Sequence, residues 1–155
     1  MATSATPMGA EPTDTLSASG SFTGKVRHMK IASGYGTAIF YGDFVKLVAA
    51  GTVEKSAITT AVVAGTVGIF VGCSYTDPTS NQLTFNQQFP ASTAADDIMA
   101  YVVDDPDLVF RMQGDGSIAQ TGLGNNVSLV NTAGSTSIGR SKNAVDASTI
   151  ATTNS

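Results

Sequence analysis

The sequence predicts an all-β protein, mainly antiparallel, built as a small barrel or sandwich with an extended N-terminal arm and an irregular C-terminal tail. Residues Gly36–Pro78 read as strand, Gly-Asp turn, strand, polar connection and long strand, ending in a Thr-Asp-Pro turn. Residues Val67–Tyr75 alternate with the period of a strand. One predicted face carries Val67, Ile69, Val71, Cys73 and Tyr75, and the other carries Gly68, Phe70, Gly72 and Ser74.

Three segments follow from composition. Residues 1–24 are small and polar, so they cannot offset the entropy of ordering and are expected to form a flexible arm. A β-domain is expected over residues 25–130, and an irregular tail over residues 131–155. The strands predicted in the domain are Lys25–Ser33, Thr37–Tyr41, Phe44–Val48, Ile58–Val63, Val67–Tyr75, Leu83–Phe89, Ile98–Val103 and Leu108–Met112, with shorter candidates at Ile118–Ala119 and Val127–Val130.

Two turns are predicted to close hairpins. Gly42-Asp43 would connect the strands on either side of it, although a hairpin turn usually has the acidic residue before the glycine. Pro106 fixes the backbone for a type I turn after Asp105, which would join Ile98–Val103 to Leu108–Met112.

The predicted core is drawn from the apolar positions of these strands. It comprises Ile39, Val45, Leu47, Val67, Ile69, Val71, Phe85, Ile98, Tyr101, Val103, Leu108 and Phe110. Alternation alone does not decide which face of Ile98–Val103 points inward, so Tyr101 and Val103 depend on that choice.

Charge limits the classes of partner. Only 13% of the residues are charged, against a usual share of about 25%. A neutral, hydroxyl-rich surface suits a protein held in an assembly, because uncharged polar groups cost less to bury than charges. The net charge of −4 argues against nucleic-acid binding. No segment is long and apolar enough to span a membrane, and none has the pattern of a signal peptide.

Residues that could carry chemistry are expected to be structural. Cys73 is the single cysteine, lies on the most apolar strand and is expected to be a buried thiol. His28, the single histidine, has no nucleophile motif beside it. The acidic residues Asp96, Asp97, Asp104, Asp105 and Asp107 do not follow the spacing of a calcium loop, so turn carboxylates are expected instead. No catalytic residue, metal or cofactor is predicted.

A partner-binding site is predicted at the end of the arm. Leu16 and Phe22 are spaced, large apolar residues in an otherwise small and polar segment. A cationic cluster follows in Lys25, Arg27 and Lys30, with His28 between them. The cluster has two readings, a solvated strand edge on which lysines discourage pairing, or a contact with an acidic protein partner. On the second reading the arm orders only on that partner, with Leu16 and Phe22 as anchors.

Several runs resemble a known group of proteins. GDFVKL (residues 42–47) and VGIFVG (residues 67–72) carry the firmest likeness, within the longer runs YGTAIFYGDFVKLVAAGTVEK, VGIFVGCSYTDPTSNQLTFNQQFPAST and DIMAYVVDDPDLVFRMQ. GNNVSLV and the final GRSKNAVDASTIATTNS are also similar, so most of residues 33–153 is covered. These runs resemble the decoration, or cement, proteins of tailed bacteriophages.

The resemblance implies a β-rich, non-enzymatic virion protein on the outer surface of a capsid, made in the host cytoplasm. It implies binding to the major capsid protein, as homotrimers at three-fold and quasi-three-fold positions, and stabilisation of the expanded shell against packaged DNA. Two other classes share the composition. One is a head-fibre base, tail or receptor-binding component of a virion, and the other is a carbohydrate-binding β-module, which the lack of tryptophan disfavours.

Overall fold

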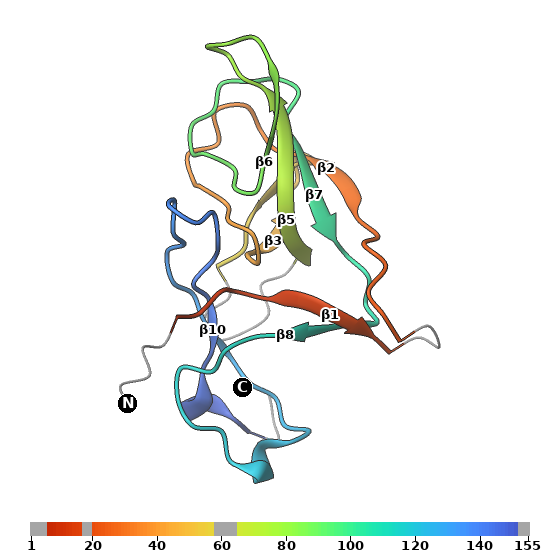
Figure 1. The fold of residues 1–155 in the computed structure, drawn as a ribbon, viewed down its shortest axis with the longest axis vertical. Coiled ribbons are helices and arrows are strands. Elements are labelled where there is room, and N and C mark those ends of the chain that lie inside the picture. The colour runs from red at the N-terminus through yellow and green to blue at the C-terminus, as the bar shows by residue number, and fades with distance from the viewer. Residues whose placement is uncertain (1–5, 17–19, 58–64, 152–155) are drawn as a thin grey trace.

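The computed structural model describes residues 6–16, 20–57 and 65–151, and it confirms a mainly β, antiparallel fold (Figure 1). The predicted strand Ile58–Val63 lies outside the described residues. The elements, in chain order, are β1 (Glu11–Thr15), β2 (Arg27–Lys30), β3 (Phe44–Leu47), β4 (Val53–Lys55), β5 (Thr66–Thr76), β6 (Leu83–Asn86), β7 (Met99–Val103), β8 (Leu108–Arg111), the 3-10 helix η1 (Gln120–Gly122), β9 (Leu129–Val130), β10 (Ala144–Val145) and the 3-10 helix η2 (Ala147–Thr149).

A six-stranded antiparallel sheet is organised around β5. β7 pairs with one edge of β5, and β2 pairs with the outer side of β7. The other edge of β5 pairs with β3 through its first half and with β6 through its second half. β4 pairs with β3, so the strand order is β2-β7-β5-β3-β4 and the sheet does not close into a barrel.

The predicted alternation of β5 is wrong in phase because the strand is irregular. Its register against β7 shifts between Phe70 and Gly72, which places an extra residue on β5. Phe70 and Cys73, three residues apart, therefore both enter the main core cluster, although the alternation placed them on opposite faces. Ile69 is buried but lies outside that cluster, so β5 is covered on both faces.

The core differs from the prediction at seven of its twelve predicted positions. Ile39, Val45, Ile69, Ile98 and Val103 are buried as predicted. Leu47 and Phe85 are 43% and 70% exposed, so their assignment to the core is wrong. Both lie near strand ends, where alternation does not show which face is covered. Val67, Val71, Tyr101, Leu108 and Phe110 are half-buried, and the core instead includes Ile31, Val53, Phe70, Cys73, Phe89 and Val102.

Neither predicted hairpin forms, although both turns do. Asp43 N–H donates to the carbonyl of Phe40, but Ile39 then bridges to Phe89 rather than to β3. Leu108 N–H donates to the carbonyl of Asp105, yet β7 pairs with β5 and β2 while β8 pairs with β1. Each turn redirects the chain to a distant partner, which local turn chemistry cannot specify.

Part of the predicted flexible arm is a strand. β1 pairs antiparallel with β8, and the two form a ribbon below the main sheet (Figure 1). Ala10 is fully buried, and its N–H donates to the carbonyl of Gly42. Gly9 has φ +76°, and a Cβ there would lie 2.6 Å from the Cβ of Ser141, so only glycine fits this approach. The N-terminal segment thus packs against the chain itself.

The predicted C-terminal tail is irregular but held by a buried carboxylate. Asp43 is fully buried and accepts hydrogen bonds from Ser141 Oγ at 2.6 Å and Asn143 Nδ2 at 3.1 Å. Its other oxygen accepts from Phe40 N–H at 2.9 Å and lies 2.9 Å from Lys55 Nζ. β10 also pairs with β9, so residues 25–130 and the segment that follows share one structure.

Candidate interaction surfaces

The predicted apolar anchors lie in different environments. Leu16 is 77% exposed just after β1, where its N–H donates to the carbonyl of Asp107. Phe22 is half-buried and lines a cavity of about 60 Å³ together with Lys25, Asp105 and Leu108. Phe22 therefore contacts its own chain, and only Leu16 is fully presented for a partner.

The predicted cationic residues lie on or beside β2 and are all exposed. Arg27 Nε lies 2.9 Å from Asp104 Oδ2, so the carboxylate that it meets belongs to the same chain. Lys30 is at the other end of β2. The structure thus places Lys25 beside Phe22, Arg27 beside Asp104 and Lys30 apart from both.

The outward face of the main sheet can be followed through the strand registers. Lys30 on β2 lies opposite Met99 on β7, which lies opposite Ser74 on β5. Ser74 in turn lies opposite Phe85 on β6. Since directly opposed residues point to the same side of a sheet, these four side chains form one row across four strands. The adjacent position along the sheet, Cys73, faces the core.

A second row lies beside the first. His28 is opposite Tyr101, and Tyr101 is opposite Gly72. The rings of His28 and Tyr101 have centroids 4.7 Å apart. A Cβ at Gly72 would be in ordinary van der Waals contact with the Tyr101 ring, at 3.6 Å, and its closer neighbour would be the carbonyl oxygen of Asn86, at 3.2 Å.

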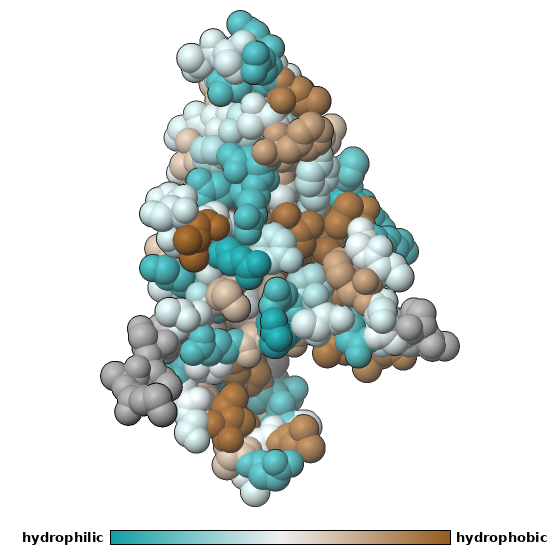
Figure 2. Space-filling model, viewed as in Figure 1, coloured by the Kyte–Doolittle hydropathy of each residue, from teal (hydrophilic) through white to brown (hydrophobic). Residues whose placement is uncertain are grey.

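We define the apolar strip as Leu83, Phe85 and Met99, which are 62%, 70% and 39% exposed. Leu83 lies opposite Thr76, two residues along from Ser74, so it extends the row that contains Phe85. Figure 2 shows apolar side chains at the surface of the upper part of the molecule, where β5 ends and β6 begins. Sequence reasoning missed this surface because it placed Phe85 in the core. The alternation in LTFNQQF shows that the strand has two faces, but it does not show which of them is buried.

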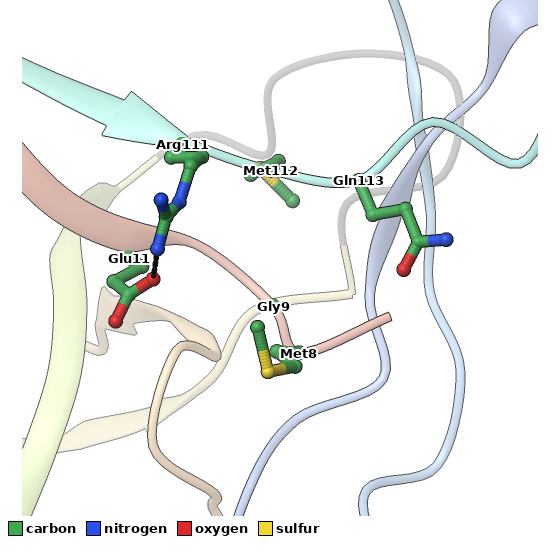
Figure 3. Close-up of a pocket in the computed structure, with 6 residues that line it drawn as sticks. All are labelled: Met8, Gly9, Glu11, Arg111, Met112 and Gln113. Carbon is green, nitrogen blue, oxygen red and sulfur yellow. Dashed lines mark hydrogen bonds and ion pairs between the residues drawn. The ribbon is translucent and has the colours of Figure 1, made fainter. Parts of the chain in front are cut away.

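A separate cavity of about 240 Å³ lies where β1 and β8 meet the N-terminal segment (Figure 3). Glu11 and Arg111 are directly opposed in the ribbon, with Arg111 Nη2 2.6 Å from Glu11 Oε2. This hydrogen bond, with the charges of Arg111 and Arg140, lowers the pKa of Glu11. Met8, Gly9, Met112 and Gln113 complete the lining. Glu11 and Arg111 pair with each other, so neither charge is left for a ligand in this cavity.

The thiol and the turn carboxylates that could take part in catalysis have structural roles instead. Burial raises the pKa of the Cys73 thiol to about 12. Asp97 accepts hydrogen bonds from the hydroxyl and the N–H of Thr76, which lower its pKa, and Asp105 accepts from Asp107 N–H. In the part of the chain that the structure describes, no group of three or more His, Cys, Asp or Glu residues could hold a metal. Among those residues there is also no helix of the length and apolarity needed to cross a membrane.

Comparison with known proteins adds no assignment. No family model, no curated protein and no solved structure matches the chain. The resemblance to phage decoration proteins therefore stays a prediction, and the functional argument depends on the surface of the molecule.

Proposed function

We propose that the chain is a structural virion protein that binds the outer surface of a phage capsid and stabilises the expanded shell. The observation that carries the proposal is the apolar strip on the outward face of the sheet. Exposed apolar side chains gathered on one face mark interaction sites more often than free surface. The resemblance of the sequence supplies the class of partner.

The proposed partner is the major capsid protein, and the proposed assembly is a homotrimer on the shell. A low charge content supports both, since subunits that meet around an axis must bury polar surface, and neutral groups are cheaper to bury than charges. The proposal includes no catalysis, no cofactor and no nucleic-acid contact. It is supported by a buried thiol, turn carboxylates that bind local backbone, and the acidic net charge.

Binding to purified, expanded capsids that lack the protein tests the proposal. Phe85→Ser removes the most exposed member of the apolar strip. Leu123→Ser is the matched control, because Leu123 is 82% exposed and lies in the connection after η1, away from the strip. We expect the wild-type protein and Leu123→Ser to saturate the capsid equally. Phe85→Ser should weaken binding by about 2 kcal/mol, the value of a buried aromatic side chain.

Copy number separates the proposal from its rivals. A decoration protein occupies many equivalent sites, whereas a head-fibre base or a tail component occupies few. Quantitative gel analysis of purified particles should give hundreds of copies, as expected for a shell-wide lattice. A handful of copies would favour a vertex or tail component, and no binding to capsids with specific binding to glycans would favour a carbohydrate-binding module.

A further inference from the structure

We propose that the outer edge of β2 is a docking site for an extended acidic segment of a partner protein, which adds to the main sheet as a further strand. The inference stands apart from the capsid proposal, because it concerns the chemistry of one sheet edge whatever protein supplies the segment. On a capsid, the shell protein would supply it.

The edge is open in the described part of the chain. β2 stands at the end of the strand order and pairs only with β7 (Figure 1). Just beyond β2, Ile31 N–H donates to the carbonyl of Ile98, in the register that pairs β2 with β7. Hydrogen-bonded positions alternate in an antiparallel pair, so Met29 and Arg27 also direct their backbone groups to β7. The N–H and C=O groups of His28 and Lys30 therefore point outward.

The side chains at those two outward positions are cationic or titratable and exposed. A strand added to β2 would place residues directly opposite His28 and Lys30, on the same face as Tyr101 and Met99. Arg27 already contacts Asp104. Lys30 therefore supplies the positive charge that this edge offers a partner, and the imidazole of His28, packed against Tyr101, lies two residues away on the same face. A fitting segment carries carboxylates at every second residue on that face.

Charge determines which strand the edge accepts. Opposite charges placed directly across a strand pair stabilise it, and like charges destabilise it. A second copy of β2 in antiparallel pairing would bring cationic side chains together, so the edge disfavours self-association while favouring an acidic segment. Lysine on an edge is usually a device against pairing. Here the lysine favours an acidic strand over other strands, because it forms a local positive site on a chain whose net charge is −4.

The proximity of the apolar strip adds a second requirement. Met99 lies between Lys30 and Ser74, and the row continues to Phe85. A partner segment on β2 is therefore continuous with the apolar face of the sheet. The partner that fits best presents an acidic strand and an apolar surface beside it.

Amide hydrogen exchange of the purified, full-length protein tests the site without any capsid. The probe is a short peptide in which glutamate alternates with valine, and the control peptide has glutamine in place of glutamate. We expect the acidic peptide to slow exchange at His28 and Lys30 and to leave Met29 unchanged, because the Met29 amide already donates to β7. An acidic peptide N-methylated on the amides of one edge should lose this effect, and the same peptide methylated on the other edge should keep it.

Affinity measurements test whether the edge recognises the carboxylates of the peptide. The acidic peptide should bind up to about fivefold more tightly than the glutamine peptide at low salt, from the charge pair opposite Lys30. The double variant His28→Glu, Lys30→Glu should remove that advantage. Lys142→Glu, an exposed lysine in the C-terminal segment, should keep it.

Each of these results with the peptides would overturn the proposal: no binding of the acidic peptide, equal binding of the two peptides, an equal loss from Lys142→Glu, or uniform protection of β2 in place of the alternating pattern. Tighter binding of an oligonucleotide than of the acidic peptide would also overturn it and assign the edge to phosphate. Since none of these measurements uses capsids, failure here leaves the capsid-binding result to be judged separately.

Discussion

Asp43→Ala tests how the C-terminal segment is held to the sheet. Asp43 is fully buried at the turn before β3 and contacts Lys55 on β4. It also binds Ser141 and Asn143 of the C-terminal segment. Removing the carboxylate leaves only the Cβ methyl group and eliminates all of these contacts at once.

The structure gives the size of the effect. The Lys55 side chain is 13% exposed, so the substitution leaves a nearly buried ammonium group without its counter-ion. Removing one partner of a buried ion pair costs about 3–5 kcal/mol. The lost hydrogen bonds from Ser141 and Asn143 lie within the same network and do not add in full. We therefore expect the free energy of unfolding to fall by about 3–5 kcal/mol, a large part of the ~5–15 kcal/mol typical of a domain.

Urea denaturation followed by circular dichroism measures this loss. Asp104→Ala is the matched control, because its partner Arg27 is 68% exposed, so solvent screens the pair and its loss leaves no buried charge; the pair should be worth under ~1 kcal/mol. The double variant Asp43→Ala, Lys55→Met removes the unpaired Lys55 ammonium group and should recover part of the stability. A loss no greater than that of Asp104→Ala, or a double variant as unstable as the single one, would refute the reasoning.

Three further predictions concern β5 and the β1–β8 ribbon. Gly68→Ala should lower the free energy of unfolding by about 1–3 kcal/mol, because its Cβ would clash with the carbonyl of Val103; an unchanged denaturation midpoint would contradict this. Cys73 should resist alkylation at pH 8 in the folded protein and react once unfolded, because burial raises its pKa from 9.0 to about 12. The stability that the protonated thiol contributes is complete below pH 9 and declines between pH 9 and pH 12. The pKa of Glu11 is lowered from 4.5, so its pairing with Arg111 stabilises the ribbon fully above pH 4.5. This stabilisation is lost as the pH falls through the lower pKa of the folded state. Glu11→Gln should therefore make the free energy of unfolding less dependent on pH in the acid range.

The elements of the fold could be predicted from the sequence where their signal is local. β2, β3, β6, β7 and β8 all fall within predicted strands, because alternation and flanking turn residues depend only on neighbours in the chain. Partner choice is not local. The turns at Gly42-Asp43 and Pro106 form, but the strands that they separate pair with distant segments.

The surface was harder to predict than the strands. The prediction takes Phe85 as core because it is an apolar position of a strand, but period-2 alternation does not say which of the two faces is covered. The β5 irregularity at Phe70–Gly72 moved the inward face by one residue. The predicted cations do lie on a sheet edge, but the capture of Arg27 by Asp104 required a contact across the fold.

A cryo-EM map of the intact particle would show where this chain binds and which of its faces is covered. We expect density for this chain over the whole outer surface of the shell, as three subunits around each three-fold or quasi-three-fold position. The sheet face that carries Leu83, Phe85 and Met99 should be in contact with a neighbouring protein. Density confined to a unique vertex or the tail, or subunits on the shell with that face exposed to solvent, would contradict this expectation.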